Sequence, residues 1–243
     1  MIKIGRNVRY FNPYKEEVEF SKKHSFDFMQ VWYDKDGIGL HKDNEPKQEI
    51  IKKYNFPTII HAVLDINEIE EHIPKLIKML KYLEHKDLII HPICRSEQIT
   101  NQTIYKLSEK VKKAFELLSD ENIKLYLENN SRLNPIFNKV EELEIMFKEN
   151  PEVEFLLDVA HIDDYSHLKN MIEVKMPKIL HVADRHLDII HEHLPLGHGN
   201  IDYSYIFREV LNQFEGKIIL EIVQNDDVII KSRDMIERII MNK

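Results

Sequence analysis

Short apolar runs alternate along this chain with longer amphipathic stretches. The short runs, bounded by polar or turn-forming residues, predict strands at residues 1–7, 26–32, 56–61, 87–92, 123–130, 153–161, 178–183 and 217–223. The longer stretches predict helices at residues 14–24, 66–83, 101–119, 137–148, 203–214 and 226–241, with a short helix after residue 161. Within 66–83, Ile69, Ile73, Leu76 and Leu80 recur at helical spacing. Residues 34–46 are polar and are predicted to form a loop.

Strands that alternate with helices predict a parallel sheet covered by helices. Eight strand–helix units in 243 residues match the size of a closed (β/α)8 TIM barrel. We therefore expect an α/β fold in which residues 1–243 form a single domain. An open doubly wound sheet is the alternative, but its glycine-rich phosphate turn is missing, because none of the six glycines forms a GxGxxG pattern.

Composition narrows the class of protein. Hydrophobic residues make up 43% of the chain and charged residues 31%, which excludes a disordered chain. The net charge of -8 makes a nucleic acid partner an unfavoured expectation, although it does not exclude one. A single cysteine, Cys94, allows no internal disulfide, and neither a signal peptide nor a membrane-spanning run is present, so we expect a cytoplasmic protein.

From the third expected strand to the eighth, every strand ends in a residue that can bind a metal ion. These residues are His61, His91, Glu128, Asp158 with His161, His181 and Glu221. In a closed barrel these ends meet at one face, where the catalytic groups of TIM barrels lie. Three carboxylates gathered there without a cation would repel one another and lose hydration. The mixture of imidazoles and carboxylates therefore predicts a divalent metal, zinc or manganese.

Residues 181–199 hold five of the thirteen histidines. Alternate residues of an extended segment point the same way, so His191 and His193 can face one ion together. The alternative is a polar, histidine-rich surface loop. The ligands at the other strand ends favour the metal-binding interpretation.

The set of strand-end residues resembles the xylose isomerase-like barrel superfamily, which includes endonuclease IV and sugar or sugar phosphate isomerases and epimerases. The similarity rests on Leu127-Glu128-Asn129, Asp158-Val-Ala-His161, His181, the run HEHLPLGHGNID and Leu220-Glu221. It implies four core metal ligands: Glu128, Asp158, His181 and Glu221. The additional ligands of the three-metal endonucleases fall on His61, His91, His161, His191 and His193. The resemblance thus implies one to three ions.

The chain departs from the family's pattern at three places. The family's Asp-x-His is His191-Glu-His193 here, and its GEG is Gly197-His198-Gly199. Replacing a carboxylate ligand by imidazole removes one negative charge from the shell of that ion. Near the start, Arg6-Asn7 stands where endonuclease IV tends to have a histidine.

The resemblance implies an enzyme, and the first hypothesis is a metal-dependent sugar or sugar phosphate isomerase or epimerase. The ion would stabilise an enediolate, while Glu128 and Glu221 exchange protons with adjacent carbons. His161, Trp32 and Arg185 are the expected substrate contacts, and Arg6 and Arg95 are further candidates for binding phosphate or hydroxyl groups.

Two alternatives remain at this point. The first is an endonuclease IV-like phosphodiesterase that cleaves abasic DNA with two or three ions. The second is a barrel that only stores or senses metal. A pair of glutamates on opposite sides of one ion suits proton transfer, which favours an enzyme over a metal store.

Overall fold

The computed structural model describes residues 2–41 and 46–242. Its strands are β1 (Lys3–Asn7), β2 (Phe28–Asp34), β3 (Gly37–Ile38), β4 (Thr58–Asp65), β5 (Asp87–Ile93), β6 (Lys124–Glu128), β7 (Glu154–Asp158), β8 (Ile179–Val182) and β9 (Lys217–Leu220). All except the short antiparallel β3 pair in parallel, and β1 pairs with both β9 and β2, which closes the sheet. The predicted closed TIM barrel is therefore confirmed.

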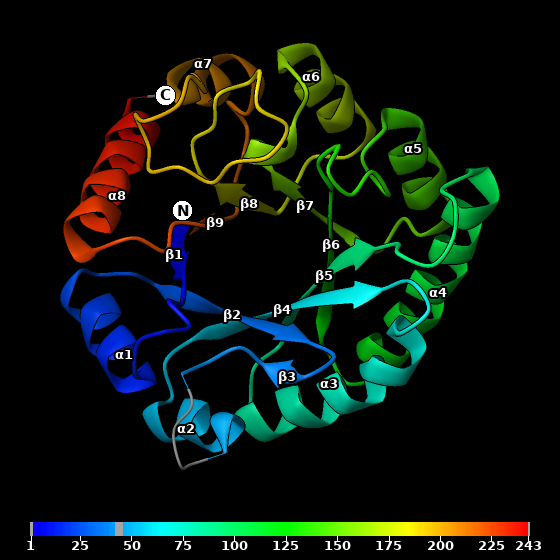
Figure 1. The fold of residues 1–243 in the computed structure, drawn as a ribbon, viewed down its shortest axis with the longest axis horizontal. Coiled ribbons are helices and arrows are strands. Elements are labelled where there is room, and N and C mark those ends of the chain that lie inside the picture. Colours follow the sequence, from blue (N-terminus) through cyan, green and yellow to red (C-terminus); the bar gives the residue numbers. More distant parts are fainter. Residues whose placement is uncertain (1, 42–45, 243) are drawn as a thin grey trace.

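Helices surround the barrel on its outside (Figure 1). They are α1 (Tyr14–Lys23), α2 (Lys47–Tyr54), α3 (Ile69–Leu83), α4 (Asn101–Ser119), α5 (Val140–Glu149), α6 (Tyr165–Val174), α7 (Tyr203–Tyr205) and α8 (Asp226–Met241), with a 3-10 turn η1 (Val159–His161) and a π-helix η2 (Ile206–Val210). Each long helix packs its apolar face on the outer side of the strands, where most of the hydrophobic core lies. Among the described residues, no helix combines the length and the apolar character that crossing a bilayer needs.

The structure differs from the sequence-based expectations at several elements. Helix α2 was not predicted, although Ile50 and Ile51 bury one side of it. The helix predicted for 203–214 ends at Val210, because a π-turn, closed by the Leu211 N–H to the Ile206 carbonyl, interrupts it. The sixth strand ends at Asp158, and His161 lies on the turn η1. Met1 and residues 42–45, part of the predicted first strand and of the 34–46 loop, lie outside the described residues.

One layer of large apolar side chains fills the centre of the barrel. Its members are Phe28, Ile59, Ile89, Tyr126, Leu156, Ile179 and Ile219. The remaining barrel strand, β1, contributes Gly5, where an added Cβ would lie 2.4 Å from the Phe28 ring. Glycine is therefore needed on β1 because the Phe28 ring occupies the space that its side chain would fill. This layer closes the barrel beneath the carboxyl ends of the strands.

Candidate metal centre

A ring of polar side chains lies directly above the apolar layer. Successive residues of a strand point to opposite faces, so the next inward position is two residues further on. Counting two residues from each member of the apolar layer gives Gln30, His61, His91, Glu128, Asp158, His181 and Glu221. The same step on β1 leads from Gly5 to Asn7. The strand ends predicted from the sequence therefore do meet at one face of the barrel.

Glu128 lies at the centre of this ring and is 1% exposed. Its Oε2 is 2.7 Å from His61 Nε2 and 3.0 Å from His91 Nδ1, and its Oε1 is 3.1 Å from His181 Nδ1. Burial by itself would raise the pKa of this carboxyl, but the imidazoles of His91, His181 and His61 hold it well below its usual value. Glu128 is therefore ionised and able to act as a ligand shared by two positions.

Glu221 approaches the imidazole of His181, which Glu128 also contacts. Its Oε1 is 3.4 Å from His181 Nδ1, and its Oε2 is 3.1 Å from His193 Nδ1. Burial opposes the charge on both histidines, yet the carboxylates raise the pKa of His181 and of His193 to about 9. Without a metal, protons on these two imidazoles balance the buried carboxylates. A divalent cation would displace those protons.

Gln30 was not predicted as part of the site. It is fully buried on β2, where its Oε1 accepts from His181 Nε2 at 2.8 Å and its Nε2 donates to Glu221 Oε1 at 2.9 Å. The hydrogen bond to His181 Nε2 leaves Nδ1 of that ring facing the carboxylates. The available signal in the sequence was an amide side chain in the middle of the apolar run Phe28-Met-Gln-Val-Trp32.

Asn129 and Asn130, which follow Glu128, orient two more histidines. The carbonyl oxygen of Asn129 accepts from His161 Nδ1 at 2.9 Å, and Asn130 Oδ1 accepts from His91 Nε2 at 2.7 Å. In each case one ring nitrogen is held by an outer partner and the other faces the ring. This arrangement is typical of histidines that bind metals.

His191 and His193 reach the ring from the loop that joins β8 to α7, residues 183–202, which we call the β8–α7 loop. Asp184 fastens this loop, because its carboxylate accepts from the backbone N–H groups of Arg185, Gly197 and Ile201. A bridge between Asp184 and Leu194 adds two backbone hydrogen bonds. Asp184 thus organises the loop through the loop's own backbone.

Arg185, expected to contact the substrate, does not line the cavity. Its side chain is buried, and its guanidinium donates to the carbonyl oxygens of Ile190 and Ile162. Arg6 likewise faces outward from β1, where it is paired with Glu17 at 2.7 Å, and Arg95 is exposed. These positions correct the expectation that the three arginines bind the substrate, because two of them are already used inside the protein and none lines the cavity.

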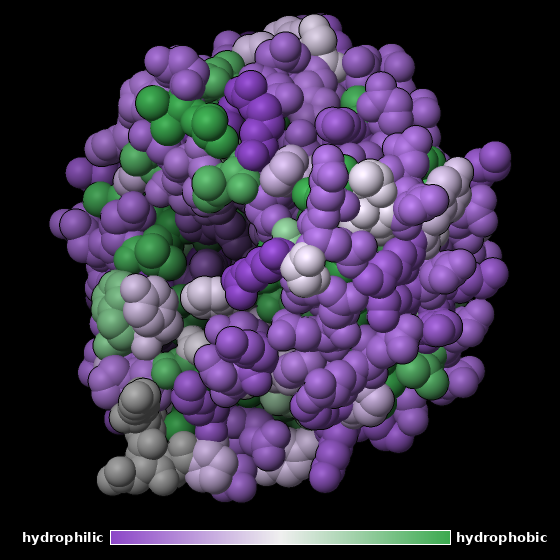
Figure 2. All heavy atoms as spheres, turned by 45° about the vertical axis from the view of Figure 1, so that its right-hand side comes forward, coloured by the Kyte–Doolittle hydropathy of each residue, from purple (hydrophilic) through white to green (hydrophobic). Residues whose placement is uncertain are grey.

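A cavity of about 380 Å³ opens above the ring, and seven of the nine predicted ligands line it: His61, His91, Glu128, His161, His191, His193 and Glu221. Asp158 and His181 are fully buried just beneath. Tyr10 and Trp32 stand at its edge, 56% and 44% exposed. No lysine or arginine of the described residues lines it. Figure 2 shows the opening as a hollow whose inner wall is hydrophilic.

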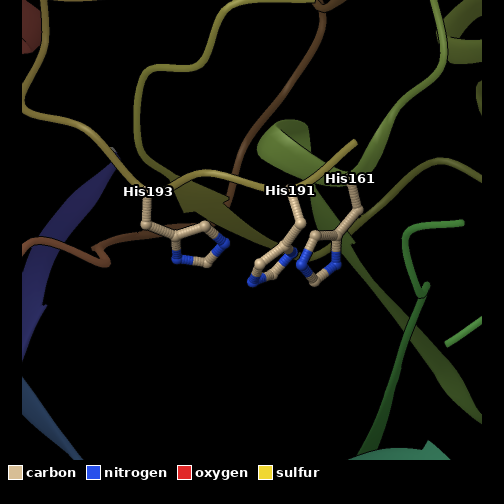
Figure 3. A group of neighbouring side chains, drawn as sticks. All are labelled: His161, His191 and His193. Atoms are coloured by element: carbon tan, nitrogen blue, oxygen red, sulfur yellow. The ribbon is translucent and has the colours of Figure 1, made fainter. Parts of the chain in front are cut away.

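The nine predicted ligands fall into overlapping groups of three whose ligand atoms lie within 4.8 Å of one another. The groups are His61–His91–Glu128, Glu128–Asp158–His181, Asp158–His193–Glu221 and His161–His191–His193, the last of which Figure 3 shows. Three buried atoms of these groups have no hydrogen-bond partner: Asp158 Oδ2, His161 Nε2 and His193 Nε2. Burying polar atoms without partners costs free energy, and a carboxylate oxygen that converges with two imidazole nitrogens suits a cation, which displaces the imidazole protons. The residues therefore fit a divalent metal.

The pKa shifts of three further side chains also agree with the binding of a divalent metal. Burial raises the pKa of Asp158, despite the attraction of His193. Burial, together with the charge of His193, lowers the pKa of His161 and of His191. His161 and His191 are therefore neutral, which is the form in which imidazole binds a metal.

Comparison with known proteins adds a family and a set of similar folds. The model of the family described as "Xylose isomerase-like TIM barrel" matches residues 18–239. A comparison with curated proteins returns no match.

Three solved structures illustrate the similarity in fold. D-psicose 3-epimerase with D-tagatose, from Clostridium cellulolyticum H10, is 15% identical, with a TM-score of 0.75 over 98% of this chain and 99% of that chain. The IOLI protein with a binding zinc atom is 15% identical, with a TM-score of 0.73 over 99% and 98%. The probable 3-DHS dehydratase AsbF from Bacillus anthracis is 14% identical, with a TM-score of 0.73 over 96% and 97%. At these identities the likeness concerns the fold alone.

Proposed function

The chain belongs to the xylose isomerase-like TIM barrel family, and from that premise we propose that it is a divalent-metal-dependent isomerase or epimerase of a small sugar. The observation that carries the proposal is the position of two glutamates on either side of one ligand. His181 Nδ1 is 3.1 Å from Glu128 and 3.4 Å from Glu221, with Asp158 Oδ2 at 3.9 Å. These four residues are the proposed ligands of the catalytic ion, zinc or manganese.

The ion, when bound, would polarise the carbonyl and hydroxyl oxygens of the substrate and so ease removal of a proton from the neighbouring carbon. One of the two glutamates, Glu221 or Glu128, would accept that proton as a carboxylate, and the other, after taking up a proton from solvent, would deliver one to the same carbon from the opposite side. Both carboxyls have a lowered pKa, so either can be the ionised group that accepts the proton. Gln30 would hold Glu221 in place through its 2.9 Å hydrogen bond.

The cavity suits a sugar without a phosphate group. Trp32 and Tyr10 offer aromatic faces at the opening, and sugar rings pack on such faces through their C–H groups. A phosphate dianion would find no lysine or arginine among the described lining residues. The similar fold of D-psicose 3-epimerase was solved with D-tagatose, an unphosphorylated ketose, which agrees with this choice. His161 lines the same cavity and is the other proposed contact to a substrate hydroxyl or an ion.

The direct test replaces Glu221 by Gln and measures conversion of a panel of free ketoses and of their phosphates, with zinc or manganese supplied. We expect the wild-type protein to convert at least one free ketose. Glu221→Gln should lower kcat by about 10²–10⁴-fold, the usual contribution of a general acid–base group. Glu192→Gln is the matched control, because Glu192 is a carboxylate of the β8–α7 loop that contacts His186 outside the cavity.

Metal content is measured on the same samples, because Glu221 is also a proposed ligand. Full activity of Glu221→Gln with the metal still bound would remove Glu221 from proton transfer. Conversion of phosphorylated ketoses alone would overturn the choice of a neutral substrate.

A second candidate, a metal-dependent phosphoester hydrolase, is favoured by one observation. The groups His61–His91–Glu128 and His161–His191–His193 offer two further metal positions beside the first. Two or three ions could together activate a water molecule and neutralise a phosphodiester. Cleavage of a duplex that carries an abasic site, without conversion of any ketose, would select this function over the first.

A further inference from the structure

The segment that joins β1 to α1, residues 8–13, forms part of the cavity wall, and we call it the β1–α1 loop. Val8 and Tyr10 of this loop line the cavity together with Asn7, the last residue of β1. The ring of Tyr10 meets that of Phe11 edge-on, with the centroids 5.4 Å apart, and both side chains are exposed. Burial of these rings therefore does not fix the loop, and its position depends on how its backbone is held.

Glu17 of α1 holds this loop through a buried cluster of charges. The side chain is fully buried, and its carboxylate accepts from the backbone N–H and from Nε of Arg9, both at 2.9 Å. It also accepts from the Asn12 amide at 2.9 Å and lies 2.7 Å from Arg6 Nη2. Burial opposes the charge of Glu17, but Arg6 and the hydrogen bonds from Arg9 and Asn12 lower its pKa. One carboxylate thus ties both ends of the loop to α1.

Arg9 joins the same cluster to α8. Its Nη1 is 2.5 Å from Oδ1 of Asp226, the first residue of α8, and 3.4 Å from the carbonyl oxygen of Gln224. Arg6 Nη1 donates to the Asn7 carbonyl at 3.0 Å. Buried ion pairs of this kind are costly to desolvate, and apolar residues in their place are often at least as stable. A gain in stability is therefore a weak reason for this cluster, whereas its contacts with the cavity wall suggest a role at the site.

We propose that Glu17 and Arg9 are positioning residues of the substrate site, which hold the β1–α1 loop where Asn7 and Tyr10 contact the sugar. This inference rests on the proposed function. The Asn7 amide would bind a sugar hydroxyl, and the Tyr10 ring would pack on C–H groups of the sugar. Neither Glu17 nor Arg9 lines the cavity, so each acts through the loop.

The test loosens the loop without changing its cavity-lining residues. Asp226→Asn removes the carboxylate that Arg9 contacts, and its control, Asp227→Asn, removes the next carboxylate in the first turn of the same helix. Both aspartates are exposed, so both variants should fold. Asp226→Glu keeps a carboxylate near Arg9 and should behave as the wild type. Arg9→Met removes all contacts of the guanidinium and should give a larger effect of the same kind.

Two measurements on the intact, metal-loaded protein are compared. Hydrogen exchange across residues 8–13 should be faster in Asp226→Asn than in Asp227→Asn. For a ketose that the wild type converts, KM should rise by about 2–10-fold for each loop side chain that binding must then immobilise, with kcat unchanged. A merely structural role would lower stability and leave KM as it is.

Sugar binding can also be followed without conversion, because Trp32 is the only tryptophan of the chain and lines the same cavity. Its fluorescence, titrated with the same free ketoses, gives a dissociation constant that should rise in Asp226→Asn as KM does.

Equal exchange of the loop in Asp226→Asn and Asp227→Asn would overturn the proposal, and so would faster exchange with an unchanged sugar affinity. A wild type that neither binds nor converts a ketose would instead contradict the proposed function, and loop exchange would still decide whether the cluster holds the loop.

Discussion

Gln30 links two ligands of the proposed catalytic ion that come from distant parts of the chain. One amide group bonds His181 through its oxygen and Glu221 through its nitrogen. Because Oε1 can only accept, His181 must carry its proton on Nε2 and present Nδ1 to the metal position. A single neutral side chain thereby sets both the tautomer of a ligand and the direction of a carboxylate.

Replacing Gln30 by Leu should therefore weaken metal binding without removing a ligand. We expect the affinity for Mn²⁺ or Zn²⁺ to fall by about 10–100-fold. The free energy of unfolding should fall by about 1–3 kcal/mol, because His181 Nε2 and Glu221 Oε1 lose a buried hydrogen-bond partner. Isothermal titration of the metal-free protein and urea denaturation measure the two effects.

Met29→Leu is the control for this variant, because Met29 is equally buried on the same strand but faces away from the barrel interior. Metal affinity equal to that of the wild type in Gln30→Leu would show that His181 is oriented without the amide.

Among the elements, the β8–α7 loop contributes most to the site without being a strand or a helix. It carries His191 and His193, yet its shape depends on Asp184 and on the buried Arg185. At Gly199 an added Cβ would lie 2.5 Å from the Arg185 backbone, so the end of the loop packs closely on its beginning. The loop is therefore a folded unit whose backbone is held by the Asp184 carboxylate.

Asp184→Ala should release this loop. Three backbone N–H groups would lose their acceptor, each at a cost of about 1–3 kcal/mol where it stays buried. We expect faster hydrogen exchange across residues 185–201, which include His191 and His193, while the strands keep their protection. Exchange followed by mass spectrometry measures this, with the exposed Asp188→Ala as control. Unchanged exchange in Asp184→Ala would contradict the role of its carboxylate.

Over the whole molecule, the closed barrel brings three carboxylates and six imidazoles together at one end, all of them buried or half-buried except His191. Metal-free protein can tolerate this only by binding protons, which is why the pKa values of His181 and His193 are raised to about 9 from an ordinary 6.5. A raised pKa in the folded state contributes stability below the unfolded value, and that stability is lost as the pH rises through the folded value.

The free energy of unfolding of the metal-free protein should therefore fall between about pH 6.5 and pH 9. The raised pKa of Asp158 acts in the same direction. The lowered values of Glu128 and Glu221 add nothing in this range, because both carboxyls are ionised in folded and unfolded chains alike. Urea denaturation in chelator at pH 6.5 and pH 9 measures the change.

Added Mn²⁺ or Zn²⁺ should remove the loss at pH 9, because the ion replaces the protons and binds more tightly as the histidines deprotonate. Stability in chelator that stays level or rises over this range would show that the two imidazoles are not protonated in the metal-free fold.

Several features of this protein could be predicted from single strands. From β4 to β9, an apolar residue is followed two positions later by His, Asp or Glu at the strand end, as in Ile59 with His61 and Ile219 with Glu221. The alternation of strands and helices predicted the barrel, and these strand-end residues predicted the gathering of the ligands. It missed α2, whose short apolar face is weak, and it placed Arg185 at the substrate because sequence distance from a strand end says nothing about side-chain direction.

The order of apolar and polar residues along the chain by itself determined the alternation of strands and helices, and with it the parallel sheet and the types of ligand at the carboxyl ends of its strands, because side-chain hydrophobicity decides which segments are buried. Only the tertiary structure decided which ligands share a position, and that Gln30, Asn129 and Asn130 orient the histidines. The reason is that these relations join residues up to 191 positions apart, such as Gln30 and Glu221, and closure of the sheet brings them into contact.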